Sequence, residues 1–135
     1  MSSFPLKIMT PDGTAFDGQV QSVSCRTITG QVQLMARHID YCTALGMGEA
    51  HITLEDGTQR SAACMGGMVS VLGGRVTLTA TTFEWAEDID TDRSHASEER
   101  AREKLGHGDL TDTELAMAEA RLKRALIRQQ VSRMK

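Results

Sequence analysis

The residue types that could perform covalent chemistry are thinly scattered in this chain. Cys25, His38 and Asp40 form the one set that could serve on paper as nucleophile, base and orienting carboxylate. Such a constellation is defined in space, and three common residue types do not predict it. The sequence also lacks the G-x-x-x-x-G-K-S/T, H-E-x-x-H and G-x-S-x-G motifs, and no G-x-G-x-x-G precedes a helix. We therefore expect no catalytic residues, no independent enzyme and no ATPase activity of the chain's own.

The cysteines do not predict a metal site or a disulfide framework. Cys25, Cys42 and Cys64 are odd in number and far apart in the sequence. This spacing matches neither paired bridges nor a closely spaced CxxC zinc pair. We expect reduced thiols, most of them buried, and no bound metal.

Charge and hydropathy exclude further classes of partner. Fifteen basic and eighteen acidic side chains give the 135 residues a net charge of -3. A general nucleic-acid binder needs more positive charge than this to hold phosphates. No apolar run approaches the roughly 18 residues that cross a bilayer, and residues 1–5 lack the basic and apolar regions of a signal peptide. We expect a soluble cytosolic protein with no nucleic-acid partner and no direct membrane insertion.

The elements that must position these residues fall into two halves with different periodicity. Up to about residue 83, short segments such as 68–72 and 75–79 alternate apolar and polar residues. The turn signals between the segments are Thr10–Thr14, Glu55–Gly57, Gly66–Gly67 and Gly73–Gly74. Short strands at this spacing are typical of a sandwich or a barrel.

Beyond Phe83 and Trp85 the composition favours helices. β-branched residues become rare, while Ala, Glu, Arg, Lys and Leu dominate. We predict a first helix that ends near Leu105, a stop at 106–109, and a second helix that begins with the capping box at 111–114. The two helices should form an antiparallel hairpin.

The two predicted helices differ in charge. Residues 84–103 carry eight acidic side chains and three arginines, whereas residues 111–135 carry six basic and three acidic side chains. Each exposed ion pair contributes only roughly a few tenths of a kcal/mol to stability. A hairpin held by such pairs could therefore detach and pack elsewhere. The alternative is a permanently docked hairpin whose charges are solvated.

Several segments, taken in order, resemble one family. They are Thr10-Pro11-Asp12-Gly13 after the first strand, the Gly30 to His38 segment, Gly66-Gly67, and Ala86 to Arg93 ahead of the helices. Over essentially the whole chain, and with its β-then-α division, this set resembles the epsilon subunit of F-type ATP synthases. The resemblance implies an α+β fold in which a ten-stranded β-sandwich (residues 1–85) precedes an antiparallel two-helix hairpin (residues 86–135).

The resemblance also implies a noncatalytic role in the central rotor stalk. The sandwich would bind the γ subunit and the c-ring and couple ion-driven rotation to ATP synthesis, at the cytoplasmic face of the cell membrane. The hairpin would stay folded on the sandwich or extend along γ to the α and β catalytic subunits and inhibit ATP hydrolysis. A switch of this kind needs two packings that differ by only a few kcal/mol. A free-standing sandwich-and-helix adaptor without a rotor role is the alternative.

One set of candidate contact residues follows from the resemblance. Gly30, Gln31 and the loop around His38 occupy the stretch that faces the c-ring in the family. The chain departs from the family pattern here, because Gln33 stands where a small residue is common and Asp40 where a proline is common. A structural or surface role for His38 is the alternative.

A regulatory ATP site is the second implication. In some bacterial members an Ile-Asp-x-x-Arg-Ala segment helps to bind ATP, which stabilises the folded hairpin. Its counterpart here is the segment 89–94, with Ser94 in place of the alanine. Matching to the family nominates Glu84, Ile89, Asp90, Arg93 and Arg100 as ATP-binding residues.

These residue types suit a nucleotide. Asp90 and the nearby backbone could bind the adenine, Ile89 could pack against it, and the guanidinium groups of Arg93 and Arg100 could hold phosphate oxygens. In the alternative interpretation Asp90 only caps the helix, and the two arginines pair with Glu84, Glu87 or neighbouring acids.

Overall fold

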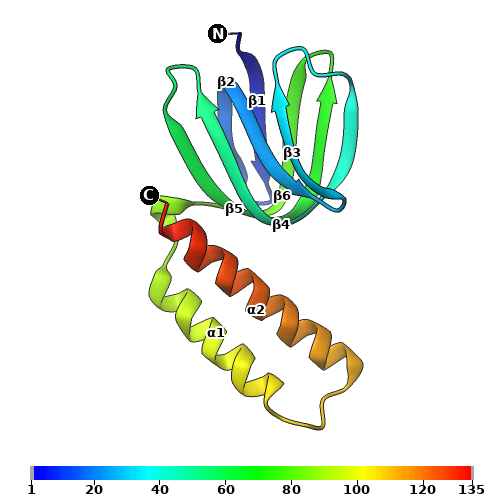
Figure 1. Cartoon of the computed structure of the whole chain (residues 1–135), viewed down its shortest axis with the longest axis vertical. Helices are drawn as coiled ribbons and strands as arrows, with labels where there is room; N and C mark the ends of the chain where they lie inside the picture. Colours follow the sequence, from blue (N-terminus) through cyan, green and yellow to red (C-terminus); the bar gives the residue numbers. More distant parts are fainter. Residues whose placement is uncertain (1, 135) are drawn as a thin grey trace.

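The computed structural model describes residues 2–134, in which six strands are followed by two α-helices. The strands are β1 (Phe4–Thr10), β2 (Gly13–Thr27), β3 (Gly30–Met35), β4 (Tyr41–Leu54), β5 (Gln59–Leu72) and β6 (Arg75–Trp85). A short 3-10 helix, η1 (Ala86–Asp88), leads to α1 (Thr91–Leu105) and α2 (Asp112–Ser132). The strands form one body, and the two helices form a hairpin that projects from it (Figure 1). The expected β-rich N-terminal part and helical C-terminal part are confirmed.

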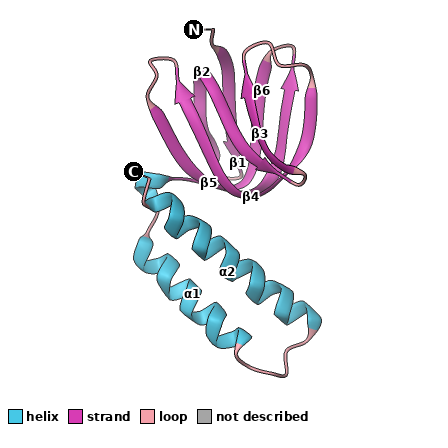
Figure 2. Cartoon of the chain, viewed as in Figure 1, coloured by secondary structure: helices cyan, strands magenta, loops and turns pink. Residues whose placement is uncertain are grey.

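The strands form a sheet that closes on itself. Their order is β1-β6-β5-β4-β2-β3, and an additional pairing of β1 with β2 completes a ring. The β1–β6 pairing is parallel, and the other pairings are antiparallel. The result is a barrel with sandwich-like opposed faces, on which β3 is an additional strand paired with β2 (Figure 2).

The expectation of ten strands is corrected to six within residues 2–134. Gly66 and Gly67 do not end a strand, because β5 continues on both sides of them. The strand is irregular at this point, where the two glycines have φ values of 76° and 115°. A Cβ atom on Gly67 would lie 2.0 Å from the carbonyl oxygen of Thr79, so only glycine allows β6 to approach here. Long strands thus replace pairs of short ones.

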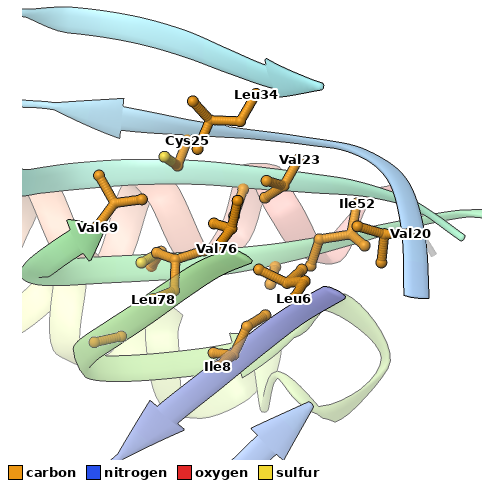
Figure 3. Packing of buried hydrophobic residues seen from close by; sticks show 14 of the residues in the cluster. Leu6, Ile8, Val20, Val23, Cys25, Leu34, Ile52, Val69, Val76 and Leu78 are labelled. Carbon is orange, nitrogen blue, oxygen red and sulfur yellow. The ribbon is translucent and has the colours of Figure 1, made fainter. Parts of the chain in front are cut away.

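Alternation along the strands builds the barrel core. Inward positions of every strand are apolar, and their side chains form one continuous cluster (Figure 3). Fully buried members include Leu6, Ile8, Val23, Ile52 and Leu78. Burial of such side chains stabilises the fold by about 1.5–3 kcal/mol each.

The hairpin is held together by small and polar side chains. At the start of α1, the carboxylate of Asp90 accepts a hydrogen bond from the backbone N–H of Arg93, and Thr111 and Glu114 form a capping box at the start of α2. The buried residues of the two helices are mostly Ala and Ser, and the side-chain amide of Gln129 donates to Glu98 at 2.8 Å. Neither helix in residues 2–134 has the length and apolar content that a bilayer crossing requires.

A second apolar cluster docks the hairpin on the barrel. Ala63 and Met65 point outward from β5 and are buried against Ile89 and Val131. Their neighbours Ala62 and Cys64 point into the barrel core, which explains why four consecutive residues of β5 are buried. We call this cluster, completed by Ala86, the docking cluster. It lies near the C-terminal end of α2, so the hairpin is fastened at one end (Figure 1).

Candidate functional site

A cleft of about 920 Å³ lies where the barrel meets the hairpin. It is lined from β1, the β1–β2 turn, β6, η1 and both helices. The charged residues that line it are Asp12, Glu84, Asp88, Asp90, Arg93, Arg100, Arg121, Arg124 and Arg128. Four of the five nominated ATP-binding residues are therefore brought together, and a ligand here would touch both parts of the molecule.

Helix geometry aims the residues of α1 into the cleft. Arg93, Ser97 and Arg100 lie four and three positions apart, so their side chains share one face of α1. Asp90 lines the same cleft and caps the helix, since its Oδ1 accepts from the backbone N–H of Arg93 at 3.0 Å. Capping and lining the cleft are thus compatible roles for this carboxylate.

Ile89 is placed elsewhere. Its side chain is only 5% exposed and belongs to the docking cluster, where it packs with Ala63 and Val131. It is absent from the residues that line the cleft. The structure places Ile89 among the contacts that fasten the hairpin, and its packing against an adenine stays a prediction.

Of the alternative interpretation, the structure shows the helix cap formed by Asp90 and does not show the pairing of acids with Arg93 and Arg100 in residues 2–134. Glu84 forms its ion pair with Arg128 of α2, and Glu87 forms one with Arg60 of β5. Within residues 2–134, Arg93 and Arg100 have no ion-pair partner. Their guanidinium groups are thus available to an anionic ligand.

Sequence analysis missed the cations that α2 contributes. Arg121, Arg124 and Arg128 line the cleft opposite α1. Their spacing of three and four residues was a signal that they share one helix face. The link from Arg128 to Glu84, 44 positions away, became visible only with the fold.

The cleft has a charge gradient. Its acids, Asp12, Glu84, Asp88 and Asp90, come from the barrel, η1 and the start of α1, whereas its arginines come from the two helices. Guanidinium groups match phosphate oxygens, and carboxylates accept hydrogen bonds from amino groups. The arrangement can therefore orient a ligand that has an anionic end and a hydrogen-bonding polar end.

The residues nominated as contacts to the c-ring or γ do not lie together. Gly30 and Gln31 begin β3 at the β2–β3 turn, whereas His38 lies in the loop after Met35. The six residues of β3 separate the two positions by about 20 Å. The β3–β4 loop lies at the end of the barrel that is remote from the hairpin (Figure 1).

The loop around His38 presents an apolar surface. Ile39 is 79% exposed, and Leu72, the last residue of β5 before the neighbouring β5–β6 turn, is 68% exposed. The two segments are tied together, because Oδ1 of Asp40 accepts a hydrogen bond from the backbone N–H of Gly73 at 3.0 Å. The residue that departs from the family's proline thus fixes the loop against the turn. His38 is partly buried, and its Nδ1 lies 2.7 Å from the carbonyl oxygen of Ile39.

No nucleophile and base are assembled from the set proposed on paper. Cys25 is buried in the barrel core, where burial raises the pKa of its thiol to about 11. Burial also raises the pKa of the Cys64 thiol to about 12, whereas Cys42 is exposed. A thiol with a raised pKa is a poor nucleophile at neutral pH. Among the described residues, no group of three or more His, Cys, Asp or Glu could hold a metal ion.

Family comparisons decide what this architecture is. Residues 3–86 match the family model described as "ATP synthase, Delta/Epsilon chain, beta-sandwich domain". Residues 87–133 match "ATP synthase, Delta/Epsilon chain, long alpha-helix domain". The chain belongs to the ATP synthase delta/epsilon family. The predicted epsilon subunit of ATP synthase is thereby confirmed, and so is its role as a noncatalytic central-stalk subunit.

Curated relatives match the chain over nearly their full length. The chain is 34% identical to the ATP synthase epsilon chain of an Exiguobacterium species, with 100% of this chain and 99% of the relative covered. It is also 34% identical to the epsilon chain of Caldanaerobacter subterraneus, with 96% and 94% covered.

Solved structures share the fold. A chain in the Euglena gracilis mitochondrial ATP synthase has a TM-score of 0.84 at 20% identity, with 100% of this chain and 83% of that chain covered. A chain in the Tetrahymena thermophila mitochondrial ATP synthase has a TM-score of 0.62 at 16% identity, with 95% of each covered.

Proposed function

We propose that this epsilon subunit inhibits ATP hydrolysis by the complex, and that bound nucleotide controls the inhibition. Residues 1–85 bind the γ subunit and the c-ring, and residues 86–135 regulate hydrolysis by docking on the barrel or extending toward the α and β catalytic subunits. ATP in the cleft stabilises the docked hairpin. The observation that carries the proposal is the cleft itself, whose lining comes from the barrel and from both helices.

Linkage explains why ATP would act on the hairpin. A ligand that contacts both parts binds the docked arrangement and not the extended one, so it stabilises docking by RT ln(1 + [L]/Kd). At a free concentration of one hundred times Kd this amounts to about 2.7 kcal/mol. The docking cluster is small and lies at one end of the hairpin, so a change of this size can decide between two positions.

Specific roles follow for the residues that line the cleft. Arg93 and Arg100 on α1, with Arg124 on α2, hold phosphate oxygens, because none of the three is neutralised by an ion pair in residues 2–134. Asp90 and Glu84 lie on the acidic side of the cleft and accept hydrogen bonds from the base or ribose.

Titration with ATP tests the site. Wild type should show saturable binding by calorimetry at nucleotide concentrations up to the millimolar range, and Arg93→Ala should weaken it at least tenfold, about 1.4 kcal/mol. Lys123→Ala is the matched control, because it removes a cation from an α2 position that does not line the cleft. Absence of saturable binding to wild type, or equal losses in the two variants, would end the ATP proposal.

Partner contacts are the second part of the proposal. The exposed Ile39 and Leu72, tied together through Asp40 and Gly73, supply an apolar end for a partner, and Gly30 and Gln31 supply a contact at the other end of β3. With γ and the c-ring as partners, the subunit sits peripherally at the cytoplasmic face of the membrane. Copurification with γ should decrease in Ile39→Asp and persist in Glu119→Lys, which changes an exposed α2 position. Full retention of γ by Ile39→Asp would remove this surface from the proposal.

Deletion of the hairpin tests whether it inhibits ATP hydrolysis. In the reconstituted complex, deletion of residues after Asp90 should leave assembly intact and raise the rate of ATP hydrolysis. Unchanged hydrolysis would contradict inhibition by the hairpin. Failure of the full chain to copurify with γ would instead contradict the proposed contact with γ.

A further inference from the structure

Three leucines form a stripe along one side of α2. Leu115, Leu122 and Leu126, with Glu119 between the first two, follow one another at spacings of four, three and four residues. This is the a/d spacing with which a helix of a coiled coil presents its seam to another helix. Leu115 and Leu126 are each 40% exposed, although leucine favours burial. We call these four residues the α2 seam.

The seam lies on the side of α2 that faces away from the cleft. A shallow groove of about 260 Å³ lies beside Leu122 and Leu126, and the described residues that line it all belong to α2. At 3.6 residues per turn, the centre of the three leucines lies about 150° around the helix from that of Arg121, Arg124 and Arg128, which line the cleft. A partner on the seam would therefore leave the cleft open to a ligand.

The apolar spacing of the seam is self-complementary. The order four-three-four reads the same in both directions along the helix. A twofold axis at the middle of the seam therefore places Leu115 of one copy against Leu126 of a second copy, in an antiparallel pair of α2 helices. The same axis brings Glu119 of each copy next to Leu122 and Lys123 of the other.

The charges of α2 fit the same arrangement. Glu119 and Lys123 have opposite charges and are both exposed. They form no ion pair with each other within residues 2–134. Across the axis, each Glu119 lies beside a Lys123, so the pair of helices gains two ion pairs. A charged residue within an apolar seam also specifies register, because a shifted pairing would bury its charge without a partner.

We propose that free copies of this chain pair through the α2 seam, antiparallel and around a twofold axis. The leucines supply the apolar contact, and the two Glu119–Lys123 pairs set direction and register. The antiparallel direction also suits the position of the barrel. Because the docking cluster fastens the barrel near the C-terminal end of α2, the two barrels would lie at opposite ends of the pair (Figure 1).

The interface is small, and pairing should be weak. One seam of three leucines lies at the low end of specific interfaces, so we expect dissociation at roughly tens of micromolar. Pairing therefore concerns the free subunit at high concentration. The proposal does not depend on ATP binding or on contact with γ.

Charge reversal tests the pairing of the full chain by equilibrium sedimentation, from about 5 to 500 µM in low salt. Wild type should shift from monomer to dimer over this range. Glu119→Lys and Lys123→Glu each place like charges across the axis and should raise the dissociation constant about tenfold. The double variant Glu119→Lys/Lys123→Glu restores opposite charges and should return to within about twofold of wild type. An equimolar mixture of the two single variants should also pair, as heterodimers.

Two further variants complete the test. Glu103→Lys makes the same change in net charge at an exposed α1 position outside the seam, so it should leave the dissociation constant within about twofold of wild type. Leu126→Glu should abolish pairing over the tested range, while circular dichroism shows that the chain remains folded. The proposal is overturned if wild type stays monomeric, if the double variant fails to restore pairing, or if Glu103→Lys weakens it equally. A monomeric wild type whose Leu126→Glu variant loses γ would assign the seam to γ instead.

Discussion

The barrel and the hairpin are stabilised in different ways. The barrel encloses one continuous cluster of large apolar side chains drawn from all six of its strands. The hairpin buries mainly Ala and Ser between its helices and touches the barrel through the docking cluster. Large buried side chains make a single cooperative core, whereas small ones leave little apolar area to hold an element in place.

This difference fits a barrel that stays folded in place and a hairpin that can move. The barrel can remain folded while it grips a partner, because its core does not depend on the helices. The hairpin can leave the barrel at the cost of one small cluster and the ion pair from Glu84 to Arg128. A ligand in the cleft, as proposed above, would then set the balance, since it would add contacts to both the barrel and the hairpin.

The largest expected effect is a truncation in the barrel core. Leu78→Ala removes a fully buried side chain and leaves a cavity, so the free energy of unfolding should fall by about 2–5 kcal/mol. Urea unfolding followed by the fluorescence of Trp85, the single tryptophan, measures it. The control Leu72→Ala removes the same atoms from a side chain that is 68% exposed, and should stay within about 0.5 kcal/mol. Equal losses in the two variants would contradict the single-core description.

A charge in the docking cluster should separate the two regions. Val131→Asp forfeits about 1.5–3 kcal/mol of apolar burial and places a carboxylate against Ala63 and Met65. The hairpin should undock, so that hydrogen exchange of α1 and α2 speeds up while the barrel strands keep their protection. The control Ala116→Asp changes an exposed α2 position and should leave exchange unchanged. Loss of protection in the barrel strands as well would show that the two regions unfold as one unit.

Local patterns predicted the elements better than their continuity. Alternation and turn signals located the strands, and the capping box at Thr111 marked the start of α2 correctly. Gly66 and Gly67 were interpreted as a turn, because a glycine pair allows positive φ equally in a turn and in a bulge. Which of the two forms depends on whether neighbouring strands continue alongside, and β4 and β6 both do.

The sequence predicted most of the α1 and barrel residues of the candidate site, but not the residues that α2 contributes. Resemblance nominated Glu84, Asp90, Arg93 and Arg100, which do meet in the cleft. The contribution of α2 depends on how the docking cluster sets the hairpin against β6, a long-range contact that no local pattern encodes. For the same reason, the sequence did not predict that Ile89 packs in the docking cluster.

Removal of a helix cap should affect the hairpin alone. In Thr111→Ala the backbone N–H of Glu114 loses its acceptor, the hydroxyl 3.1 Å away, which costs about 1 kcal/mol of helix stability. Hydrogen exchange at the first turn of α2 should accelerate, with no change in the barrel. Thr113→Ala removes a hydroxyl from an exposed position inside the same turn and serves as the control. A matching acceleration in the control would remove the cap from the explanation.

Acid provides the smallest test, because each region carries a carboxyl group whose pKa is lowered. Hydrogen bonds from Gln129 and Arg102 lower the pKa of Glu98 in the hairpin, and hydrogen bonds from Thr58 lower that of Asp56 in the β4–β5 turn. A lowered folded-state pKa means that the unfolded state binds more protons in acid. The contribution to stability is therefore present above the ordinary carboxyl pKa and is lost as pH falls through the lowered one.

Replacement of the carboxyl group in one region should thus remove the acid sensitivity of hydrogen exchange in that region alone. Glu98→Gln should flatten the pH dependence of hydrogen exchange in α1 and α2 below about pH 4.5 and leave that of the β4–β5 turn unchanged. Asp56→Asn should do the reverse. If either substitution flattened both profiles, the two regions would share one acid transition, and the separation between a fixed barrel and a lightly held hairpin would fail at its most sensitive point.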